Sequence, residues 1–202
     1  MLVVKIGGSL LGTPELQIWL DILAREGDGR IVIVPGGGVF ADAVRVAQKV
    51  GNFNDATAHH AALLAMDQFG LVMEGLQPGL ATAASELEIS ERSWQHRAIV
   101  WLPSRMVLAD DDIPKSWDVT SDSLAAWLTA KLGAEELILV KYSDTIDTRF
   151  TVPQLISENV LDPSFDRFAA NLRCPVSVIG KQGYRMVLDK LLSRQQPTRA
   201  VS

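Results

Sequence analysis

The stretch that decides the fold is Leu2-Val3-Val4-Lys5-Ile6-Gly7-Gly8-Ser9, a short apolar run that ends in two glycines. A second stretch, Ile31-Val32-Ile33-Val34-Pro35-Gly36-Gly37-Gly38, repeats this design. Each apolar run is typical of a buried β-strand, and each glycine cluster leads into a helix-like segment. Because glycine has no side chain, backbone N–H groups there can approach a ligand, and a helix N-terminus adds free donors and partial positive charge. The two clusters therefore predict two anion sites held face to face, as phosphoryl transfer requires.

Strand-like and helix-like segments alternate along the rest of the chain. Apolar runs lie at 2–6, 31–34, 99–102, 137–140 and 176–179, and helix patterns at 14–25, 39–50, 55–73, 122–131 and 184–192. This alternation predicts an α/β fold with helices on both faces of a mainly parallel sheet. We expect one domain over residues 1–202, with 145–161 as its least regular stretch and a loose tail from residue 195. In such sheets ligands bind beyond the C-terminal ends of the strands, where both glycine clusters lie.

The composition argues against several classes of protein. The formal net charge is -5 and no run of Lys or Arg occurs, so nucleic-acid binding has little electrostatic support. Cys174 is the single cysteine, which excludes an intrachain disulfide and is typical of a reducing compartment. The N-terminus lacks the pattern of a secretory signal, and no apolar run approaches the ~18 residues of a membrane span. We therefore expect a cytoplasmic protein with neither nucleic-acid nor membrane partners.

Two lysines lie close to the predicted ligand-binding edge of the sheet. Lys5 sits inside an apolar strand, where an ammonium is costly unless it reaches an anion or a carboxylate, or else reaches solvent at the strand end. Lys141 follows the run at 137–140 and would project at the same edge. Catalysis of phosphoryl transfer is mostly positioning and charge neutralisation, so two lysines and a carboxylate that aligns them would suffice. The sequence contains neither a P-loop nor a G-x-G-x-x-G motif, so the glycine clusters belong to another phosphate-binding design.

A third segment, Asp118-Val119-Thr120-Ser121-Asp122, leads into the helix pattern at 122–131. Its hydroxyl and carboxyl side chains are common helix caps, so a plain N-terminal cap is one interpretation. The other is that Asp122 holds and orients the lysines, and that Asp118 and Asp122 approach a bound magnesium ion. His60 and Trp117 are further candidates for an acceptor pocket, although a partly buried helical histidine is the simpler explanation of His60.

These motifs together resemble the amino acid kinase superfamily, which includes carbamate, acetylglutamate, aspartate, isopentenyl phosphate and bacterial uridylate kinases. The resemblance covers nearly the whole chain, through the segments 3–9, 34–38, 120–122 and 137–141. Ala58-His59-His60-Ala61 and the segment 114–123 resemble the small kinases of methanofuran biosynthesis, which phosphorylate an aminomethylfuran methyl phosphate. The resemblance implies a three-layer αβα sandwich around an open, mainly parallel sheet, and a homodimer or a larger homo-oligomer.

The resemblance also implies a role for each matching residue. The catalytic residues would be Lys5, which stabilises the phosphoryl group in flight, Asp122, which organises the lysines, and Lys141. The nucleotide would be bound by Gly7, Gly8, Ser9, Lys141 and Asp144. The acceptor would be bound by Gly36, Gly37, Gly38, Asp118 and Thr120. No metal site of the chain's own is expected, because magnesium would arrive with ATP.

The predicted function is therefore ATP- and magnesium-dependent transfer of the γ-phosphoryl group to a small phosphate monoester, with the aminomethylfuran phosphate favoured. A uridylate or isopentenyl phosphate kinase is one alternative. A non-catalytic nucleotide- or oxyanion-binding protein on the same scaffold is another. The last alternative is favoured by Lys141-Tyr142-Ser143-Asp144-Thr145-Ile146-Asp147-Thr148, which lacks a glycine found in many relatives. A second departure from the family pattern is Lys181-Gln182-Gly183-Tyr184, which stands where relatives have Pro-Gly, and both departures concern the nucleotide half.

Overall fold

The structure is a computed structural model that describes residues 1–145 and 150–195. One sheet runs through these residues, with its strands in the order β3-β4-β2-β1-β5-β6 and every described pair parallel. The strands are β1 (Leu2–Ile6), β2 (Ile31–Pro35), β3 (Leu80–Ala83), β4 (Ala98–Trp101), β5 (Glu136–Lys141) and β6 (Val176–Gly180). The predicted α/β fold with a mainly parallel sheet is confirmed. The expectation of a single domain over 1–202 stays a prediction.

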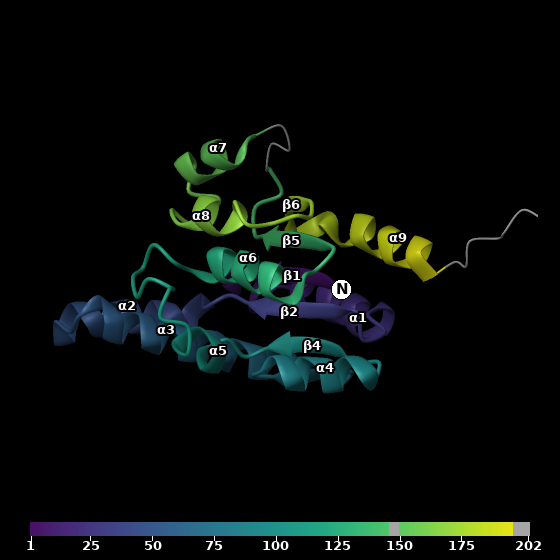
Figure 1. Cartoon of the computed structure of the whole chain (residues 1–202), viewed down its shortest axis with the longest axis horizontal. Helices are drawn as coiled ribbons and strands as arrows, with labels where there is room; N and C mark the ends of the chain where they lie inside the picture. Colours follow the sequence, from purple (N-terminus) through teal and green to yellow (C-terminus); the bar gives the residue numbers. More distant parts are fainter. Residues whose placement is uncertain (146–149, 196–202) are drawn as a thin grey trace, which may run out of the picture.

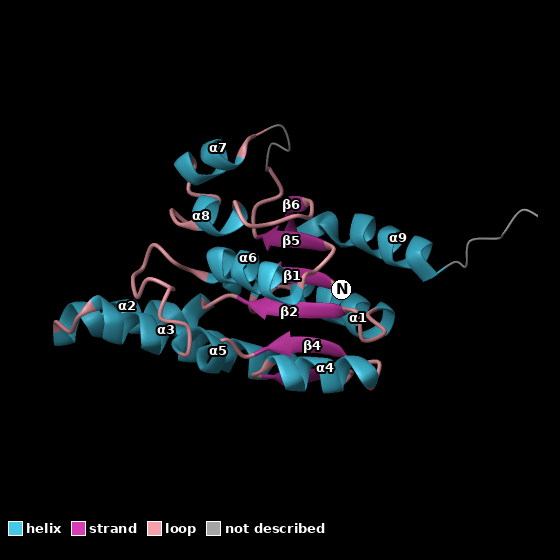
Figure 2. Ribbon diagram, viewed as in Figure 1, coloured by secondary structure: helices cyan, strands magenta, loops and turns pink. Residues whose placement is uncertain are grey.

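Helices cover both faces of the sheet, which makes the three-layer αβα sandwich visible in Figure 2. They are α1 (Pro14–Glu26), α2 (Gly38–Gly51), α3 (Asp55–Leu76), α4 (Glu86–Trp94), α5 (Ser104–Leu108), α6 (Ser121–Leu132), α7 (Val152–Ser157), α8 (Phe165–Ala169) and α9 (Tyr184–Gln195), with short 3-10 turns η1 (Gly8–Leu10) and η2 (Lys181–Gly183). In Figure 1, α2 and α3 extend past the C-terminal ends of the strands, at the left of the view. No described helix is both long and apolar enough to cross a membrane.

The alternation of side chains along the strands builds two cores, one on each face of the sheet. On one face, Val3 and Val32 pack with α6, α4 and α8. On the other, Val4 and Ile33 pack with α1 and α9. The long helix α3 contributes residues to both clusters. Lys5 belongs by this alternation to the face that α6 covers, so α6 can bring its own side chains to the lysine.

The predicted elements are present, with several additions. The helix pattern expected over 55–73 continues to Leu76, so it includes part of the turn expected at 75–79. The short strand β3 and the helix α4 were not predicted, because Leu80–Ala83 is only four residues long and α4 buries a single apolar residue, Ile89. Part of the stretch expected to be irregular, 145–161, forms α7, and residues 146–149 of it lie outside the described residues. The tail 196–202, expected to be loose, also lies outside them.

The sheet topology determines where a ligand can lie. The chain leaves β1 toward β2 on one side, whereas β5 and β6 lie on the other side of β1. Strand order therefore reverses beside β1, and in parallel sheets the crevice at such a point is where ligands bind. The loops that follow β1, β2 and β5 all open at this edge, and they carry the glycine clusters and Lys141.

Candidate active site

The two glycine loops pack directly against each other. A Cβ atom added to Gly8 would lie 2.1 Å from the backbone nitrogen of Gly38, and one added to Gly36 would lie 2.4 Å from the backbone nitrogen of Gly8. The backbone N–H of Gly36 donates to the carbonyl of Ile6 at 2.9 Å, which ties the second loop to the end of β1. Gly38, the first residue of α2, has a φ of 52°, a conformation that suits glycine. Only glycine allows these two backbones to approach so closely.

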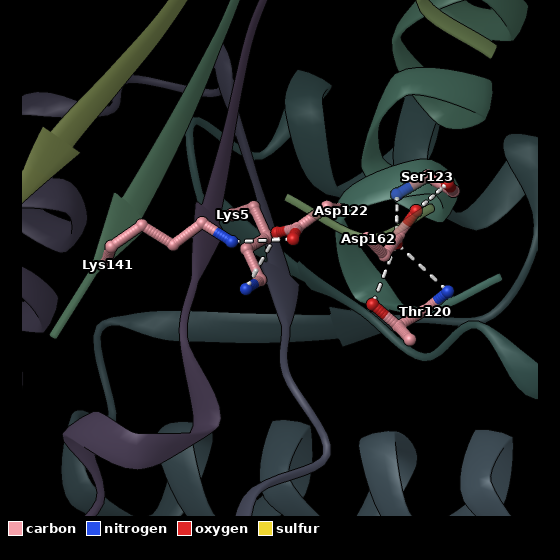
Figure 3. A network of polar contacts seen from close by, with 6 residues as sticks. All are labelled: Lys5, Thr120, Asp122, Ser123, Lys141 and Asp162. Carbon is pink, nitrogen blue, oxygen red and sulfur yellow. Dashed lines mark hydrogen bonds and ion pairs between the residues drawn. The ribbon is translucent and has the colours of Figure 1, made fainter. Parts of the chain in front are cut away.

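A cluster of three charged side chains lies at this edge of the sheet (Figure 3). The Nζ atom of Lys5 lies 2.9 Å from Oδ1 of Asp122, in an ion pair without hydrogen-bond geometry. The Nζ atom of Lys141 donates to Oδ2 of the same carboxylate at 2.5 Å. Lys5 comes from β1, Asp122 from the first turn of α6 and Lys141 from the end of β5. Lys5 and Asp122 are almost fully buried, so the cluster is held with little solvent around it.

The cluster carries one positive charge in excess, because two ammonium groups share a single carboxylate. Burial by itself raises the pKa of Asp122, but Lys5 and Lys141 more than offset it and lower that pKa below its ordinary value. The pKa of Lys141 is lowered to about 8, mainly by burial and then by Lys5, although Asp122 and Asp162 act in the opposite direction. An anion that entered the site would neutralise the excess charge, so the cluster is suited to bind phosphate oxygens.

Asp162, on the loop between α7 and α8, fixes the first turn of α6. Its Oδ2 accepts hydrogen bonds from the backbone N–H and the hydroxyl of Thr120, at 3.0 and 2.7 Å, and from the N–H of Ser123 at 3.0 Å. Its Oδ1 accepts a further hydrogen bond from the Ser123 hydroxyl. The side chain of Thr120 does not cap its own helix, so Asp162 provides the cap instead. This network, drawn in Figure 3, holds the helix turn that carries Asp122.

A cavity of about 480 Å³ opens on one side of the glycine loops. Its lining includes the loops themselves and combines apolar with polar side chains: Gly8, Ser9, Gly36, Gly37, Gly38, Asp42, Arg45, His59, Leu63, Met66, Trp117 and Thr120. The guanidinium of Arg45 lies 3.9 Å from the ring centroid of Trp117, and the indole N–H of Trp117 donates to Gln48 at 2.7 Å. We call this space the acceptor cavity, because it contains Gly36–Gly38, which the sequence predicts to bind the acceptor.

A second cavity, of about 440 Å³, lies on the other side of the same loop. Its lining includes Lys5, Gly7, Gly8, Ser9, Lys141, Tyr142, Phe150, Leu155 and Glu158. Gly8 and Ser9 line both cavities, so the two spaces meet at the end of β1. We call this second space the donor cavity, because it contains Gly7 and Lys141, which the sequence predicts to bind the nucleotide. Two small molecules, one in each cavity, would therefore come together at Gly8, next to the charged cluster.

The structure does not bring every predicted site residue to these cavities. Asp118 is exposed and is not part of either described lining. Asp144 is exposed, and its carboxylate accepts a hydrogen bond from the backbone N–H of Gln182 at 2.9 Å instead of lining the donor cavity. His60 points to the exposed side of α3, whereas its neighbour His59 is buried and lines the acceptor cavity. Trp117 lines that cavity, as anticipated.

No set of metal ligands accompanies the charged cluster. Among residues 1–145 and 150–195, no three His, Cys, Asp or Glu side chains gather closely enough to hold a metal ion. Both oxygens of Asp122 face lysine ammonium groups, so the idea that Asp118 and Asp122 jointly approach a magnesium ion is not supported by their placement.

Comparison with known proteins gives the class of this chain. Residues 1–151 match the model of the amino acid kinase family. A [5-(aminomethyl)furan-3-yl]methyl phosphate kinase from Methanocaldococcus jannaschii is 34% identical over 160 residues, which cover 78% of this chain and 73% of that protein. The fold, the site and these matches define a phosphotransferase. The chain belongs to the amino acid kinase family.

Solved structures share the same fold at low sequence identity. A uridylate kinase from Archaeoglobus fulgidus superposes with a TM-score of 0.65 at 17% identity, covering 93% of this chain and 95% of that one. A UMP kinase from Bacillus anthracis gives a TM-score of 0.67 at 15% identity, covering 95% and 91%. At such identities the likeness concerns the fold alone, so it does not indicate the acceptor.

Proposed function

We propose that this kinase transfers the γ-phosphoryl group of ATP, bound with Mg²⁺, to the phosphate of a small monoester, and that the acceptor is [5-(aminomethyl)furan-3-yl]methyl phosphate. The observation that carries the proposal is the junction of the two cavities at Gly8 and Ser9, beside a buried cluster with one excess positive charge. A donor and an acceptor that are both anionic need such a place, because their mutual repulsion must be offset where they meet.

The residues divide the work of the transfer among them. Lys5 lines the donor cavity beside the Gly8 loop that both cavities share, and it would neutralise the charge on the phosphoryl group as it moves. Lys141, which lines only the donor cavity, would hold the oxygens of the nucleotide phosphates. Asp122 would hold the two ammonium groups, one at each carboxylate oxygen, and so direct them. When bound with the nucleotide, Mg²⁺ would add charge neutralisation at the β- and γ-phosphates.

The proposed chemistry needs no general base. The acceptor phosphate, with its second pKa near ~6, is already a dianion at neutral pH, so its oxygen can attack without losing a proton. The bond from the γ-phosphorus to the bridging oxygen of ADP breaks as the new P–O bond to the acceptor forms, which yields ADP and a diphosphate. Catalysis then consists of alignment by backbone N–H groups and charge compensation by the lysines.

The choice of this acceptor is supported by the M. jannaschii relative and by the size and lining of the acceptor cavity. The M. jannaschii protein is named for the aminomethylfuran phosphate, and this chain is 34% identical to it. A volume of about 480 Å³ suits a small molecule, and Leu63, Met66 and Trp117 provide apolar surface for a ring. The backbone of Gly36–Gly38 opens on the same space and would hold the phosphate.

Self-association is part of the proposal as well. Val46 and Val50 on α2 expose 62% and 85% of their surface, and Leu71 on α3 exposes 52%. Burial of such side chains against a second copy would be favourable, as the proposed homodimer or larger homo-oligomer requires. Light scattering coupled to size-exclusion chromatography measures the mass directly, and a monomer at all concentrations would contradict this part.

The proposed function is tested by ³¹P NMR of the reaction mixture. With ATP, Mg²⁺ and [5-(aminomethyl)furan-3-yl]methyl phosphate we expect two coupled diphosphate signals from the product, in step with ADP. UMP and isopentenyl phosphate in parallel reactions test the alternative acceptors. Turnover of one of these but not of the furan would assign a different acceptor. Binding of ATP by calorimetry without any product would favour the non-catalytic alternative, for which the altered segment after Lys141 is the supporting observation.

A further inference from the structure

His59, on α3, has one ring nitrogen bonded and one without a partner. The side chain lines the acceptor cavity and is 4% exposed. Its Nδ1 lies 3.2 Å from the backbone carbonyl oxygen of Ser116. A carbonyl oxygen can only accept, so Nδ1 carries a hydrogen. Nε2 is buried and has no hydrogen-bond partner among the described residues. Buried polar atoms are rarely left in this condition, so the unpaired nitrogen is a place where a bound molecule could supply a partner.

The surroundings of His59 keep the ring neutral. Burial is the main cause that lowers its pKa below the ordinary value, and Lys115 and His60 lower it further, although the contact with Ser116 acts in the opposite direction. With the hydrogen fixed on Nδ1, a neutral ring leaves a bare lone pair on Nε2. His59 therefore carries an unused hydrogen-bond acceptor on a side chain that lines the acceptor cavity, and a matching ligand would have to supply a hydrogen-bond donor.

We propose that Nε2 of His59 accepts a hydrogen bond from the acceptor molecule, and that this contact selects phosphate monoesters that carry a hydrogen-bond donor away from their phosphate. The inference rests on the proposed function and narrows its substrate class. A phosphate dianion has only acceptor oxygens, so it cannot satisfy Nε2 and belongs with the backbone N–H groups of Gly36–Gly38. The hydrogen-bond donor must therefore lie at the end of the acceptor molecule that is away from the phosphate.

A protonated amine is the hydrogen-bond donor that best matches the lining of the acceptor cavity. The carboxylate of Asp42 also lines this cavity, where it pairs with Arg45 at 3.9 Å, and Arg45 in turn stacks on Trp117. A neutral imidazole lone pair accepts a hydrogen bond from an ammonium group but not from an anionic or an apolar group, so the lone pair of His59 favours an amine.

Two substitutions distinguish the proposed contact of Nε2 with the ligand from the hydrogen bond between Nδ1 and Ser116. In His59→Asn the amide N–H can replace Nδ1–H against the Ser116 carbonyl, but no atom remains at the place of Nε2. In His59→Gln the longer side chain can place a carbonyl oxygen near the position of Nε2, so it can still accept. If the hydrogen bond from α3 to the Ser116 loop were the only role of His59, His59→Asn would keep the wild-type kinetics and His59→Gln would not.

The kinetic test compares two acceptors that differ at one group. These are [5-(aminomethyl)furan-3-yl]methyl phosphate and (5-methylfuran-3-yl)methyl phosphate, which lacks the amine. We expect His59→Asn to raise the KM for the first by about tenfold or more, with the KM for ATP and the KM for the second little changed. His59→Gln should recover part of the loss. Equal effects of His59→Asn on the two furans, or no effect on either, would overturn the inference.

Nuclear magnetic resonance tests the inference without turnover. In the free wild-type protein, ¹⁵N shifts should show a neutral His59 ring with the hydrogen on Nδ1. Addition of [5-(aminomethyl)furan-3-yl]methyl phosphate, the amine probe, should move the Nε2 signal, whereas addition of (5-methylfuran-3-yl)methyl phosphate should not. A hydrogen on Nε2, or an Nε2 signal unmoved by the amine probe, overturns the inference whatever the kinetics show. If the shift occurs but neither furan is phosphorylated, the contact stands and the proposed function fails.

Discussion

The acceptor and donor cavities meet at Gly8 but are built by different means. The acceptor cavity is formed by glycine backbone, apolar side chains and the face of α3, so we expect its selectivity to depend on shape and on a few directed polar groups. The donor cavity adjoins the Lys5–Asp122–Lys141 cluster, so we expect its affinity for a ligand to depend on charge. Substitutions at the two cavities should therefore have different kinetic effects. A substitution that changes the shape of the acceptor cavity should alter acceptor binding, and one that removes a charge at the donor cavity should alter nucleotide binding and the chemical step.

The largest effect is expected from Lys5→Met, which removes an ammonium group from the lining of the donor cavity, next to the shared Gly8 loop. Because this charge would offset repulsion where the two anions meet, turnover should fall by about 10²-fold or more. Steady-state kinetics measure the loss, and circular dichroism checks the fold. Lys131→Met on the outer surface of α6, where the lysine pairs with Glu86 at 3.4 Å, is the matched control and should leave turnover unchanged. Retention of more than about a tenth of the activity in Lys5→Met would contradict the role.

The next effect concerns the shared loop. Gly8→Ala places a Cβ atom 2.1 Å from the backbone nitrogen of Gly38, so the two loops must separate. Such overpacking costs about 1–3 kcal/mol of folding stability and should raise the KM values of both substrates, because Gly8 lines both cavities. Gly75→Ala, with no heavy atom within 4 Å of the added carbon, is the control and should be neutral or slightly stabilising. An intact acceptor KM in Gly8→Ala would show that the loop does not hold the acceptor.

A smaller, pH-dependent effect should be confined to the donor side. The pKa of Lys141 is about 8, so its ammonium is lost as the pH rises through that value, and the KM for ATP should increase there while the acceptor KM changes less. Asp162→Asn removes a charge that raises this pKa, so the transition should move to lower pH. A flat ATP KM up to about pH 10 would contradict the assignment.

The same lysine should make the folding stability of the protein change with pH in the opposite direction to ATP binding. Its folded pKa, about 8, lies below the ordinary value of 10.5, so between these values the unfolded chain binds the proton and the folded chain does not. The contribution of Lys141 to the free energy of unfolding should therefore rise with pH in this window while ATP binding weakens. Urea titrations at several pH values, compared between wild type and Lys141→Met, isolate that contribution.

The smallest effect is expected at the rim of the acceptor cavity. Arg45→Met removes a guanidinium that lies 3.9 Å from the Trp117 ring centroid and leaves the indole less firmly held. The acceptor KM should rise by about threefold, with turnover and the ATP KM unchanged. Lys49→Met, on the same helix but outside the described cavity lining, is the control. An equal rise in both KM values would mean that the two cavities are not separate in function.

The glycine loops and the lysines could be predicted because their signals are local. A strand, a glycine cluster and a helix start follow one another within a few residues, and parallel strands bring such ends to one edge. Asp162 could not be found this way, because its hydrogen bonds reach residues 39 and 42 positions earlier in the chain. The sequence does hold a signal for His59 rather than His60, because His59, Leu63 and Met66 are spaced to share one face of a helix, and the structure buries all three.

The central claim is that donor and acceptor phosphates meet across Gly8, and a crystal structure with a non-hydrolysable ATP analogue, Mg²⁺ and [5-(aminomethyl)furan-3-yl]methyl phosphate tests it most directly. The account predicts the γ-phosphoryl group in the donor cavity and the monoester phosphate in the acceptor cavity, both within reach of Lys5 and the Gly8 backbone. Phosphates that bind on separate surfaces, or a monoester phosphate away from Gly36–Gly38, would contradict it.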